Sequence, residues 1–334
     1  MSTAIFTPTS AEYGQLRTDA GQVDRSGRLR MTFVGAQAAA TLNGLCTSDV
    51  LALQPGHGQY AAALTPKGKV LADVRIFQRA ADSFLVDVAG AAADGFTAMV
   101  RKYVNPRLSR YADVSASVAC VGVAGPHARQ VLAHALGCSP ATIDLLAPFA
   151  HCDVPFHGES VTVARADDYG VDGFDCFVSA AVAPALREAL MASGAPPAAA
   201  AALEVLRIEA GRPAWGIDMT DDTLLHEAGL DLLDAVSYTK GCYTGQEVVA
   251  RVHFRGHVNR ILRGLLLASP ADGETRVFAG DADVGDVRSR AVSPRLGAIA
   301  LAMLRRAVEP GTVVTVRSAN GDAPATVVEL PFPA

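Results

Sequence analysis

A chain of 334 residues, 50% apolar and 19% charged, is long enough to bury a large core and to form more than one domain. Its formal net charge of -5 argues against a general nucleic-acid coat, because such proteins need a surplus of lysine and arginine to neutralise phosphates. The six cysteines form no C-x-x-C pair, so the sequence predicts neither a disulfide framework nor a zinc ribbon and favours a reducing compartment.

The beginning of the chain gives no sign of export. The first twenty residues contain Glu12 and Asp19 and lack an apolar stretch of signal-peptide length. No apolar run is long enough to span a bilayer, since the alanine-rich run 198–202 is bracketed by Pro197 and Glu204. We therefore expect a cytoplasmic protein that has no membrane partner.

Residues 58–88 have the pattern of three consecutive strands, with a Thr-Pro-Lys-Gly turn at 65–68 and a break at 80–82. Side chains of the second strand alternate between two faces. One face carries Val70, Ala72, Val74 and Ile76, and the other carries Leu71, Asp73, Arg75 and Phe77. The alternation therefore predicts that Asp73 and Arg75 point to the same side of the sheet.

A helix is expected directly after this meander, because Phe96, Met99, Val100 and Tyr103 recur at i, i+3, i+4 and i+7. Strands and helices then alternate as far as residue 210. This order predicts an α+β arrangement with antiparallel sheets.

The pattern changes after about Asn259, where short β-rich runs at 261–267, 284–292, 313–317 and 325–330 are broken by glycine and proline. We expect a small C-terminal β-barrel. A linker near 256–259 divides the chain into residues 1–256, expected to hold two interleaved α+β subdomains, and residues 257–334, expected to form the barrel.

The most informative segment is residues 240–247, Lys-Gly-Cys-Tyr-Thr-Gly-Gln-Glu, in which Thr244 to Glu247 has the form of a capping box. A helix that begins there places Cys242 just before oriented backbone amides, which favour the thiolate form of a cysteine. Lys240 shares its side in an extended approach and adds a positive charge. Cys242, with Lys240 beside it, is therefore the candidate catalytic thiol; the alternative is a small buried cysteine.

Basic residues are concentrated in the same region. Residues 240–263 contain Lys240, Arg251, Arg255, Arg260 and Arg263 against the single acid Glu247. Guanidinium groups bind carboxylates and phosphates through two contacts, so Arg251 is a candidate for holding an anionic organic ligand. A solvated basic face is the alternative. His253 and His257 stand at i and i+4, but no acidic partner follows them, so no metal site is expected.

A second informative run, residues 207–216, combines the end of a helix with a rigid loop. Glu209 lies in the last helical turn, where the helix dipole disfavours an acid, so we expect a specific hydrogen-bond donor for it. A carboxylate pairs with two adjacent N–H groups of a heterocycle, and Trp215 can stack on a flat ring. The alternative is a salt bridge from Glu209 to Arg207 or Arg212.

The run from Lys240 to Glu247, followed by Arg251, resembles the signature of the YgfZ group of folate-binding proteins, which are relatives of the glycine cleavage T protein. The resemblance extends to the runs at 33–35, 42–45, 48–50, 64–69, 207–211 and 284–289. It implies a three-part α+β fold with antiparallel sheets and helices around a central folate pocket, plus a small C-terminal barrel. It also implies that residues 1–256 bind tetrahydrofolate or a one-carbon derivative.

The resemblance also implies roles for individual residues. Glu209 falls where T-protein relatives hold the pterin, and Cys242 is the motif cysteine. The expected cofactor-binding residues are Glu209, Arg251, Asp73, Trp215 and Tyr103. One departure concerns the meander: where aminomethyltransferases have two adjacent acids, this chain has Ala72 followed by Asp73.

The main hypothesis from the sequence is a tetrahydrofolate-binding accessory factor that assists assembly or repair of iron-sulfur enzymes, with client or assembly proteins as partners. One alternative is a folate-dependent aminomethyltransferase, which the Ala72 departure disfavours. A second is a folate-linked tRNA-modification factor, against which the acidic net charge speaks. A third is a redox sensor in which Cys242 merely reacts. Whether the protein has turnover of its own stays open; an enzymatic role would be that of a folate-dependent one-carbon transferase.

Overall fold

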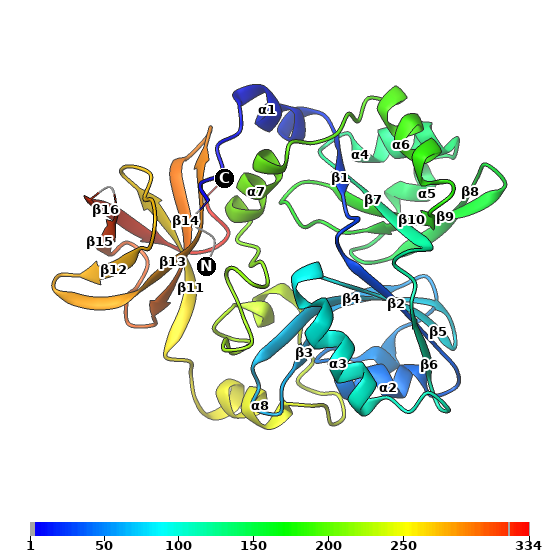
Figure 1. The fold of residues 1–334 in the computed structure, drawn as a ribbon, viewed down its shortest axis with the longest axis horizontal. Coiled ribbons are helices and arrows are strands. Elements are labelled where there is room, and N and C mark those ends of the chain that lie inside the picture. The colour runs from blue at the N-terminus through cyan, green and yellow to red at the C-terminus, as the bar shows by residue number, and fades with distance from the viewer. Residues whose placement is uncertain (1–3, 320, 334) are drawn as a thin grey trace.

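The computed structural model describes residues 4–319 and 321–333, which form two sheet-based lobes and a barrel around a central helix (Figure 1). Each lobe contains a five-stranded antiparallel sheet, and the barrel is closed. The predicted α+β class with a C-terminal barrel is confirmed. Within the described residues, no helix is long and apolar enough to cross a membrane.

The first lobe has the strand order β3-β4-β5-β2-β6. Its elements are β2 (Leu29–Val34), α2 (Ala38–Leu45), η1 (Val50–Ala52), β3 (Gly58–Leu64), β4 (Val70–Ala80), β5 (Ser83–Val88), η2 (Gly90–Ala92), α3 (Ala93–Tyr103) and β6 (Arg110–Asp113). The predicted meander is thus present as β3, β4 and β5. Ala72, Val74 and Ile76 pack in one apolar core with α2 and α3, whereas Asp73 and Arg75 line a cavity. From Ala72 to Phe77 the alternation along β4 therefore has the predicted sense. At the start of the strand it is wrong: Val70 packs with Ala62 and Leu64, and Leu71 packs against the core of the first lobe, because the register shifts next to Leu64.

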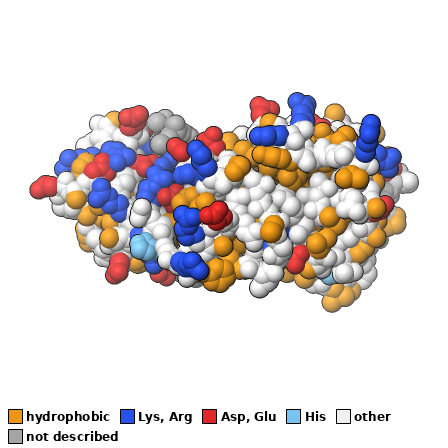
Figure 2. Space-filling model, turned by 90° about the horizontal axis from the view of Figure 1, so that it is seen from below, with side chains coloured by type: hydrophobic (Ala, Val, Ile, Leu, Met, Phe, Trp, Pro, Cys, Tyr) orange, Lys and Arg blue, Asp and Glu red, His pale blue; other side chains and the backbone are white. Residues whose placement is uncertain are grey.

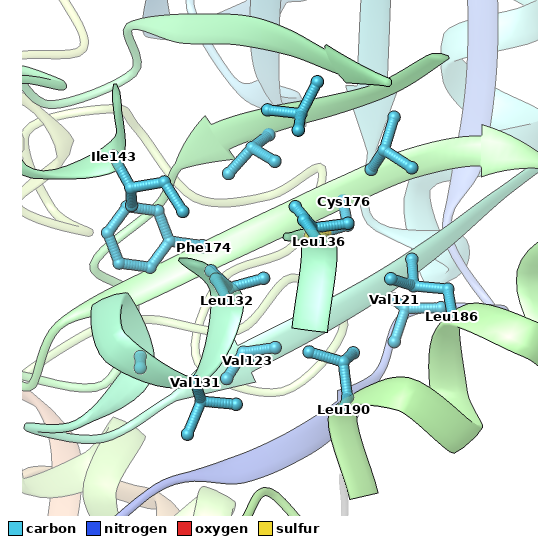
Figure 3. Close-up of a cluster of buried hydrophobic side chains, with 14 of the residues drawn as sticks. Val121, Val123, Val131, Leu132, Leu136, Ile143, Phe174, Cys176, Leu186 and Leu190 are labelled. Carbon is cyan, nitrogen blue, oxygen red and sulfur yellow. The ribbon is translucent and has the colours of Figure 1, made fainter. Parts of the chain in front are cut away.

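The second lobe has the strand order β1-β7-β10-β9-β8. Its elements are β1 (Gly21–Asp24), β7 (Val118–Ala124), α4 (Ala128–Leu136), α5 (Pro140–Asp144), β8 (His151–Phe156), β9 (Glu159–Arg165), β10 (Gly173–Ser179) and α6 (Ala183–Ala192). Leu132 of α4 and Leu186 of α6 meet Val121 and Val123 of β7 in its core (Figure 3). Because β1 precedes the first lobe in the chain, the two lobes are interleaved.

Both lobes use the same turn between a strand and a helix. Gly35 follows β2 with φ of 130° and Gly125 follows β7 with φ of 131°, a backbone conformation that favours glycine. A side chain at Gly125 would also place its Cβ 2.3 Å from the main-chain oxygen of Asp19. The repeated turn shows that the two lobes are built on the same local plan.

The barrel closes in the order β11-β14-β13-β12-β15-β16. Its strands are β11 (Arg260–Leu267), β12 (Arg276–Ala279), β13 (Ala282–Ser293), β14 (Gly297–Arg305), β15 (Val313–Ser318) and β16 (Gly321–Val328). The sequence prediction contains four of these strands and lacks β12 and β14. The run that forms β14 is rich in alanine, which has low strand propensity, but Ala300 and Ala302 are completely buried in the barrel core.

Helix α7 (Ala200–Glu209) joins the three parts (Figure 1). It shares an apolar core with α1 (Ser10–Thr18) and with β14, in which Leu16, Leu206 and Met303 are buried. The chain from residue 210 to α8 (Gln246–Arg255) contains a single short 3-10 turn, η3 (Leu230–Leu233), among its described residues. Most of the chain between α7 and α8 is therefore loop.

Candidate functional site

A cavity of about 280 Å³ lies between the two lobes and the carboxyl end of α7. Strands of the first lobe, a loop of the second lobe and the segment after α7 all contribute to it. Its lining consists of Arg25, Arg28, Tyr60, Asp73, Arg75, residues 89–91, Phe149, Asp168, Tyr169, Glu204, Arg207 and residues 212–215. Because these residues come from distant parts of the chain, the cavity exists only in the folded protein.

Buried ion pairs form one wall of the cavity. Arg75 is 2% exposed, and its guanidinium lies 2.5 Å from Asp87 and 2.5 Å from Asp175. Further ion pairs join Arg25 to Asp168 and Asp175 and join Arg28 to Asp87, at 2.7, 3.0 and 2.6 Å. Although burial acts to raise the pKa of Asp87, the guanidinium groups of Arg28 and Arg75 outweigh it and lower that pKa. Three arginines thus match three carboxylates, so this wall is close to neutral.

Asp73 is a carboxyl group that stands apart from this network. Its Oδ2 accepts a hydrogen bond from the Tyr60 hydroxyl at 3.1 Å, whereas its Oδ1 is buried and has no partner among the described residues. Burial raises the pKa of Asp73, and burial followed by the charge of Asp73 raises the pKa of Tyr60. A carboxyl group with a raised pKa and a free oxygen is suited to exchanging a proton with a ligand.

Aromatic rings border the same space. The rings of Tyr60 and Phe149 are stacked, with centroids 6.2 Å apart and planes inclined by 6°. Trp215 also lines the cavity, and its indole Nε1 donates to the main-chain oxygen of Val70 at 3.4 Å, which fixes the ring against β4. These flat apolar faces suit a ligand that contains a ring system.

Arg212 connects this cavity to a neighbouring one of about 350 Å³, since Arg212, Tyr60, Phe149 and Asp168 line both. Within the part of the chain that the structure describes, no carboxylate lies at ion-pair distance from Arg212. Its guanidinium donates at 3.5 Å to the main-chain oxygen of Asp167. Arg212 therefore retains a positive charge that can bind a carboxylate of a ligand.

Glu209, a predicted cofactor-binding residue, faces away from the cavity. It accepts hydrogen bonds from the hydroxyls of Tyr13 and Ser293 at 3.0 and 2.5 Å, and Arg295 lies 3.5 Å from it. Two residues along an α-helix correspond to a rotation of about 200°, so Glu209 and the cavity-lining Arg207 occupy opposite sides of α7. The expected specific donor is present, but α1 and the barrel supply it, and neither of the salt bridges considered as the alternative is formed.

Lys240 is buried and does not serve as a partner for the thiol of Cys242. Its Nζ donates to the main-chain oxygens of Asn43, Cys46 and Ser48 at 2.6, 2.7 and 2.7 Å. Burial lowers the pKa of Lys240 to about 8. Because an ammonium group carries three hydrogens, these three carbonyls occupy all of its donors. Lys240 thus attaches the 240–247 loop to the first lobe.

The expected capping box at Thr244 to Glu247 is not formed. Helix α8 begins after Gly245, which has φ of 84°, and no side chain caps it. A Cβ at Gly245 would lie 2.7 Å from the main-chain oxygen of Thr65, so the close approach of the two loops requires glycine. Glu247 accepts instead from Arg251 at 2.8 Å on the exposed side of α8.

Three further predicted residues lie at the surface. Cys242 has an exposed thiol, and the Arg251 side chain is 69% exposed. Tyr103 ends α3, is 47% exposed and contacts the Lys102 ammonium at 5.1 Å from its ring centroid. None of them lines the central cavity, whereas the predicted residues Asp73 and Trp215 do.

The sequence prediction does not include Tyr60, Asp168 or Arg212 among the site residues. A signal for Tyr60 exists in the hairpin register, because Tyr60 pairs with Arg75 across β3 and β4 and cross-strand partners share a face. No local pattern indicates Asp168, which follows β9 and reaches the cavity only because the two lobes pack together.

The fold and the site define an α+β protein with a preformed small-molecule cavity between two similarly built lobes. Residues 2–239 match the GCVT N-terminal domain, and residues 260–333 match the glycine cleavage T-protein C-terminal barrel domain. The chain belongs to the glycine cleavage T-protein family. The predicted relationship to the T protein is thus confirmed, whereas the narrower assignment to the YgfZ group stays a prediction.

Curated relatives support this membership along nearly the whole chain. An aminomethyltransferase of Bordetella petrii is 32% identical over 330 residues, which cover 96% of this chain and 87% of that protein. An aminomethyltransferase of Saccharopolyspora erythraea is 30% identical over 335 residues, which cover 98% of this chain and 90% of that protein. The crystal structure of glycine cleavage system aminomethyltransferase T from Bartonella henselae superposes with a TM-score of 0.87 at 24% identity, covering 97% and 89% of the two chains.

Proposed function

We propose that this protein is a tetrahydrofolate-dependent one-carbon transferase of the aminomethyltransferase type and that the central cavity is its active site. The observation that carries the proposal is the buried carboxyl group of Asp73, which keeps one oxygen free in a cavity of rings and arginines. The names of the two relatives at 30% and 32% identity agree with it.

The residues of the cavity fit the chemistry of tetrahydrofolate. A pterin is a flat ring with N–H groups, which suits the aromatic surface of Tyr60, Phe149 and Trp215 and the free oxygen of Asp73. The glutamate end of a folate carries carboxylates, which suit the unpaired guanidinium of Arg212. The adjoining cavities of about 280 and 350 Å³ provide room for a ligand longer than one ring.

The chemistry of transfer is divided between the ligand and the protein. Tetrahydrofolate, when bound, supplies the ring nitrogens that carry a one-carbon group. Asp73 exchanges a proton with the ligand through Oδ1, while the Tyr60 hydroxyl holds the other oxygen at 3.1 Å. The buried pairs of Arg75 with Asp87 and Asp175 hold this wall in one arrangement.

The departure from two adjacent acids does not remove a carboxyl group from the cavity. Ala72 is completely buried and packs in the apolar core of the first lobe. The neighbouring Asp73 points to the other face of β4, into the cavity. The position that differs from aminomethyltransferases therefore belongs to the core. Alanine at position 72 is thus compatible with methylene transfer, because the carboxyl group of Asp73 is still present in the cavity.

Two measurements test this function with the same proteins. Isothermal titration with tetrahydrofolate measures binding, and incubation with an aminomethyl-lipoyl carrier protein measures methylenetetrahydrofolate formation. We expect Asp73→Asn to bind tetrahydrofolate within about threefold of the parent and to lose transfer activity by about 10²- to 10⁴-fold, the usual contribution of a proton-transferring group. Turnover by Asp73→Asn equal to that of the parent would refute the assignment of Asp73 as the proton-transferring group. Loss of tetrahydrofolate binding in a folded Glu209→Ala variant would show that Glu209 binds the pterin.

The exposed thiol of Cys242 favours a second function, an accessory role in assembly or repair of iron-sulfur enzymes. The central cavity does not use this cysteine, yet it stands within the 240–247 motif on which the resemblance rests. A deletion strain scored for several iron-sulfur enzyme activities, and complemented with the parent, Cys242→Ala or Asp73→Asn, separates the two functions. Rescue by Asp73→Asn but not by Cys242→Ala would support the accessory role, and full rescue by Cys242→Ala would make the thiol dispensable.

A further inference from the structure

A separate cavity of about 280 Å³ lies where the carboxyl end of α8 meets the barrel. It shares no lining residue with the central cavity. Its titratable lining residues are His226, His253, His257, Arg263, Arg306 and a single acid, Asp231. Because the net charge of the chain is -5, this local excess of basic groups is a candidate site for an anionic ligand.

The two arginines of this cavity have one distant anionic partner between them among the described residues. The Arg263 side chain is 19% exposed, and its nearest recorded carboxylate oxygen, on Glu329, is 4.0 Å away. The Nε of Arg263 is buried and has no hydrogen-bond partner among the described residues. Arg306 is exposed and forms no ion pair within the described part of the chain. A buried guanidinium nitrogen without an acceptor costs free energy, which a bound anion would recover.

The histidine rings of the cavity are held in place by Tyr238. The Tyr238 ring stacks on His253 with centroids 3.6 Å apart, and its hydroxyl lies 3.1 Å from Nε2 of His226. Burial lowers the pKa of His226, while Asp231 acts to raise it and His253 acts to lower it. Two ordered imidazoles thus face the same space as Arg263, and their N–H groups can donate to a bound anion.

The carboxyl end of α8 opposes anion binding, because the helix dipole places negative charge there. That charge amounts to roughly half an elementary charge. Arg263 and Arg306 contribute two full positive charges, and Asp231, the single acid of the lining, offsets one of them when ionised. Glu329 lies 4.0 Å from Arg263, but it is outside the lining and its side chain is 75% exposed, so solvent screens its charge. The balance among the lining residues is therefore positive, and the basic groups outweigh the helix end.

The geometry points to a binding site for the phosphoryl group of a small phosphorylated molecule. A phosphoryl group offers three acceptor oxygens, which match a site with two guanidinium groups and imidazole N–H groups better than the two oxygens of a carboxylate do. The cavity opens into a groove of about 810 Å³, with which it shares His257, Val258 and Arg306. Figure 2 shows lysine and arginine side chains, interspersed with acidic ones, over the barrel half of the molecule. The groove provides room for the organic part of the ligand.

Titration of the 334-residue protein with sodium phosphate tests the site. The probe is the set of histidine C2–H proton resonances near pH 6.5, with sodium acetate at the same ionic strength as the comparison. We expect the resonances of His226 and His253 to follow one saturation curve with phosphate and to stay nearly unchanged with acetate. Substitutions His226→Gln and His253→Gln assign the two resonances.

The variants Arg263→Gln and Arg306→Gln should each raise the Kd for phosphate about tenfold, because each removes a charge-assisted hydrogen bond. Arg17→Gln is the matched control, since Arg17 is an exposed arginine on α1, outside the lining of this cavity, and its Kd should equal that of the parent. Arg306 is exposed, so its variant keeps the test valid even where Arg263→Gln folds poorly. No saturation with phosphate, equal saturation with acetate, or an unchanged Kd in Arg306→Gln would overturn the proposal. Tetrahydrofolate titration of the same variants reports separately on the central cavity.

Discussion

Replacing Arg75 by methionine tests whether the buried ion pairs hold the two lobes together. Arg75 lies 2.5 Å from Asp87 of the first lobe and 2.5 Å from Asp175 of the second, and both carboxylates are at most 1% exposed. Without Arg75, Asp87 keeps its pair with Arg28, and Asp175 keeps its pair with Arg25. Breaking a buried pair costs about 3–5 kcal/mol, and the remaining partners favour the lower end, so we expect a loss of about 3 kcal/mol.

Urea unfolding at neutral pH measures this loss, with the fluorescence of Trp215 and far-UV circular dichroism as two probes of the transition. Arg79→Met is the matched control on the same strand, because Arg79 is 32% exposed and pairs at 3.1 Å with Asp153, which is 53% exposed. We expect this control to lose about 0–1 kcal/mol. A loss in Arg75→Met as small as that of the control would refute the structural role of the network.

Other changes give distinct results. Lys240→Met should lower the free energy of unfolding by roughly 3 kcal/mol in thermal melts, because it leaves buried carbonyls without a donor. The control Cys242→Ser, at an exposed position, should stay within about 0.5 kcal/mol of the parent. Folding raises the pKa of Asp73, so the folded state favours the protonated carboxyl group. The stability of the fold therefore decreases as pH rises above about 3.9, where the unfolded carboxyl group ionises. Asp73→Asn should therefore melt above the parent at neutral pH and lose this advantage on acidification; an advantage that grows in acid would contradict the raised pKa. Gly245→Ala should lower the free energy of unfolding in urea by about 1–3 kcal/mol, because of its φ of 84° and the contact with Thr65. Gly241→Ala, with open space around it, should leave that free energy unchanged. Equal decreases in the two variants would contradict the backbone strain at Gly245.

Much of the fold follows from local patterns in the sequence. The period-two alternation of β4 predicts which side chains enter the core and places Asp73 and Arg75 on the other face, and the structure agrees from Ala72 onward. The apolar spacing of Phe96, Met99, Val100 and Tyr103 predicts α3, and the first three form its buried face, whereas Tyr103 at the helix end is 47% exposed. Such signals are reliable because they reflect the geometry of a single element.

Strands whose stability comes from distant partners escape this kind of prediction. The alanine-rich β14 is a strand because β11 and β13 pair with it on both sides and the barrel interior requires small side chains. The helix start at α8 likewise depends on the approach of Gly245 to the turn at Thr65, which no capping pattern contains.

The sequence by itself determined the class of the fold, the barrel, the relationship to the T protein and two cavity residues, Asp73 and Trp215. Only the tertiary structure decided that Glu209 faces α1 and the barrel, that Lys240 is occupied by three carbonyls, and that Arg212 has no carboxylate partner among the described residues. The reason is physical: periodicity along the chain specifies the direction of a side chain within its own element. What the side chain meets there depends on how separate elements pack, and that is a property of the whole fold.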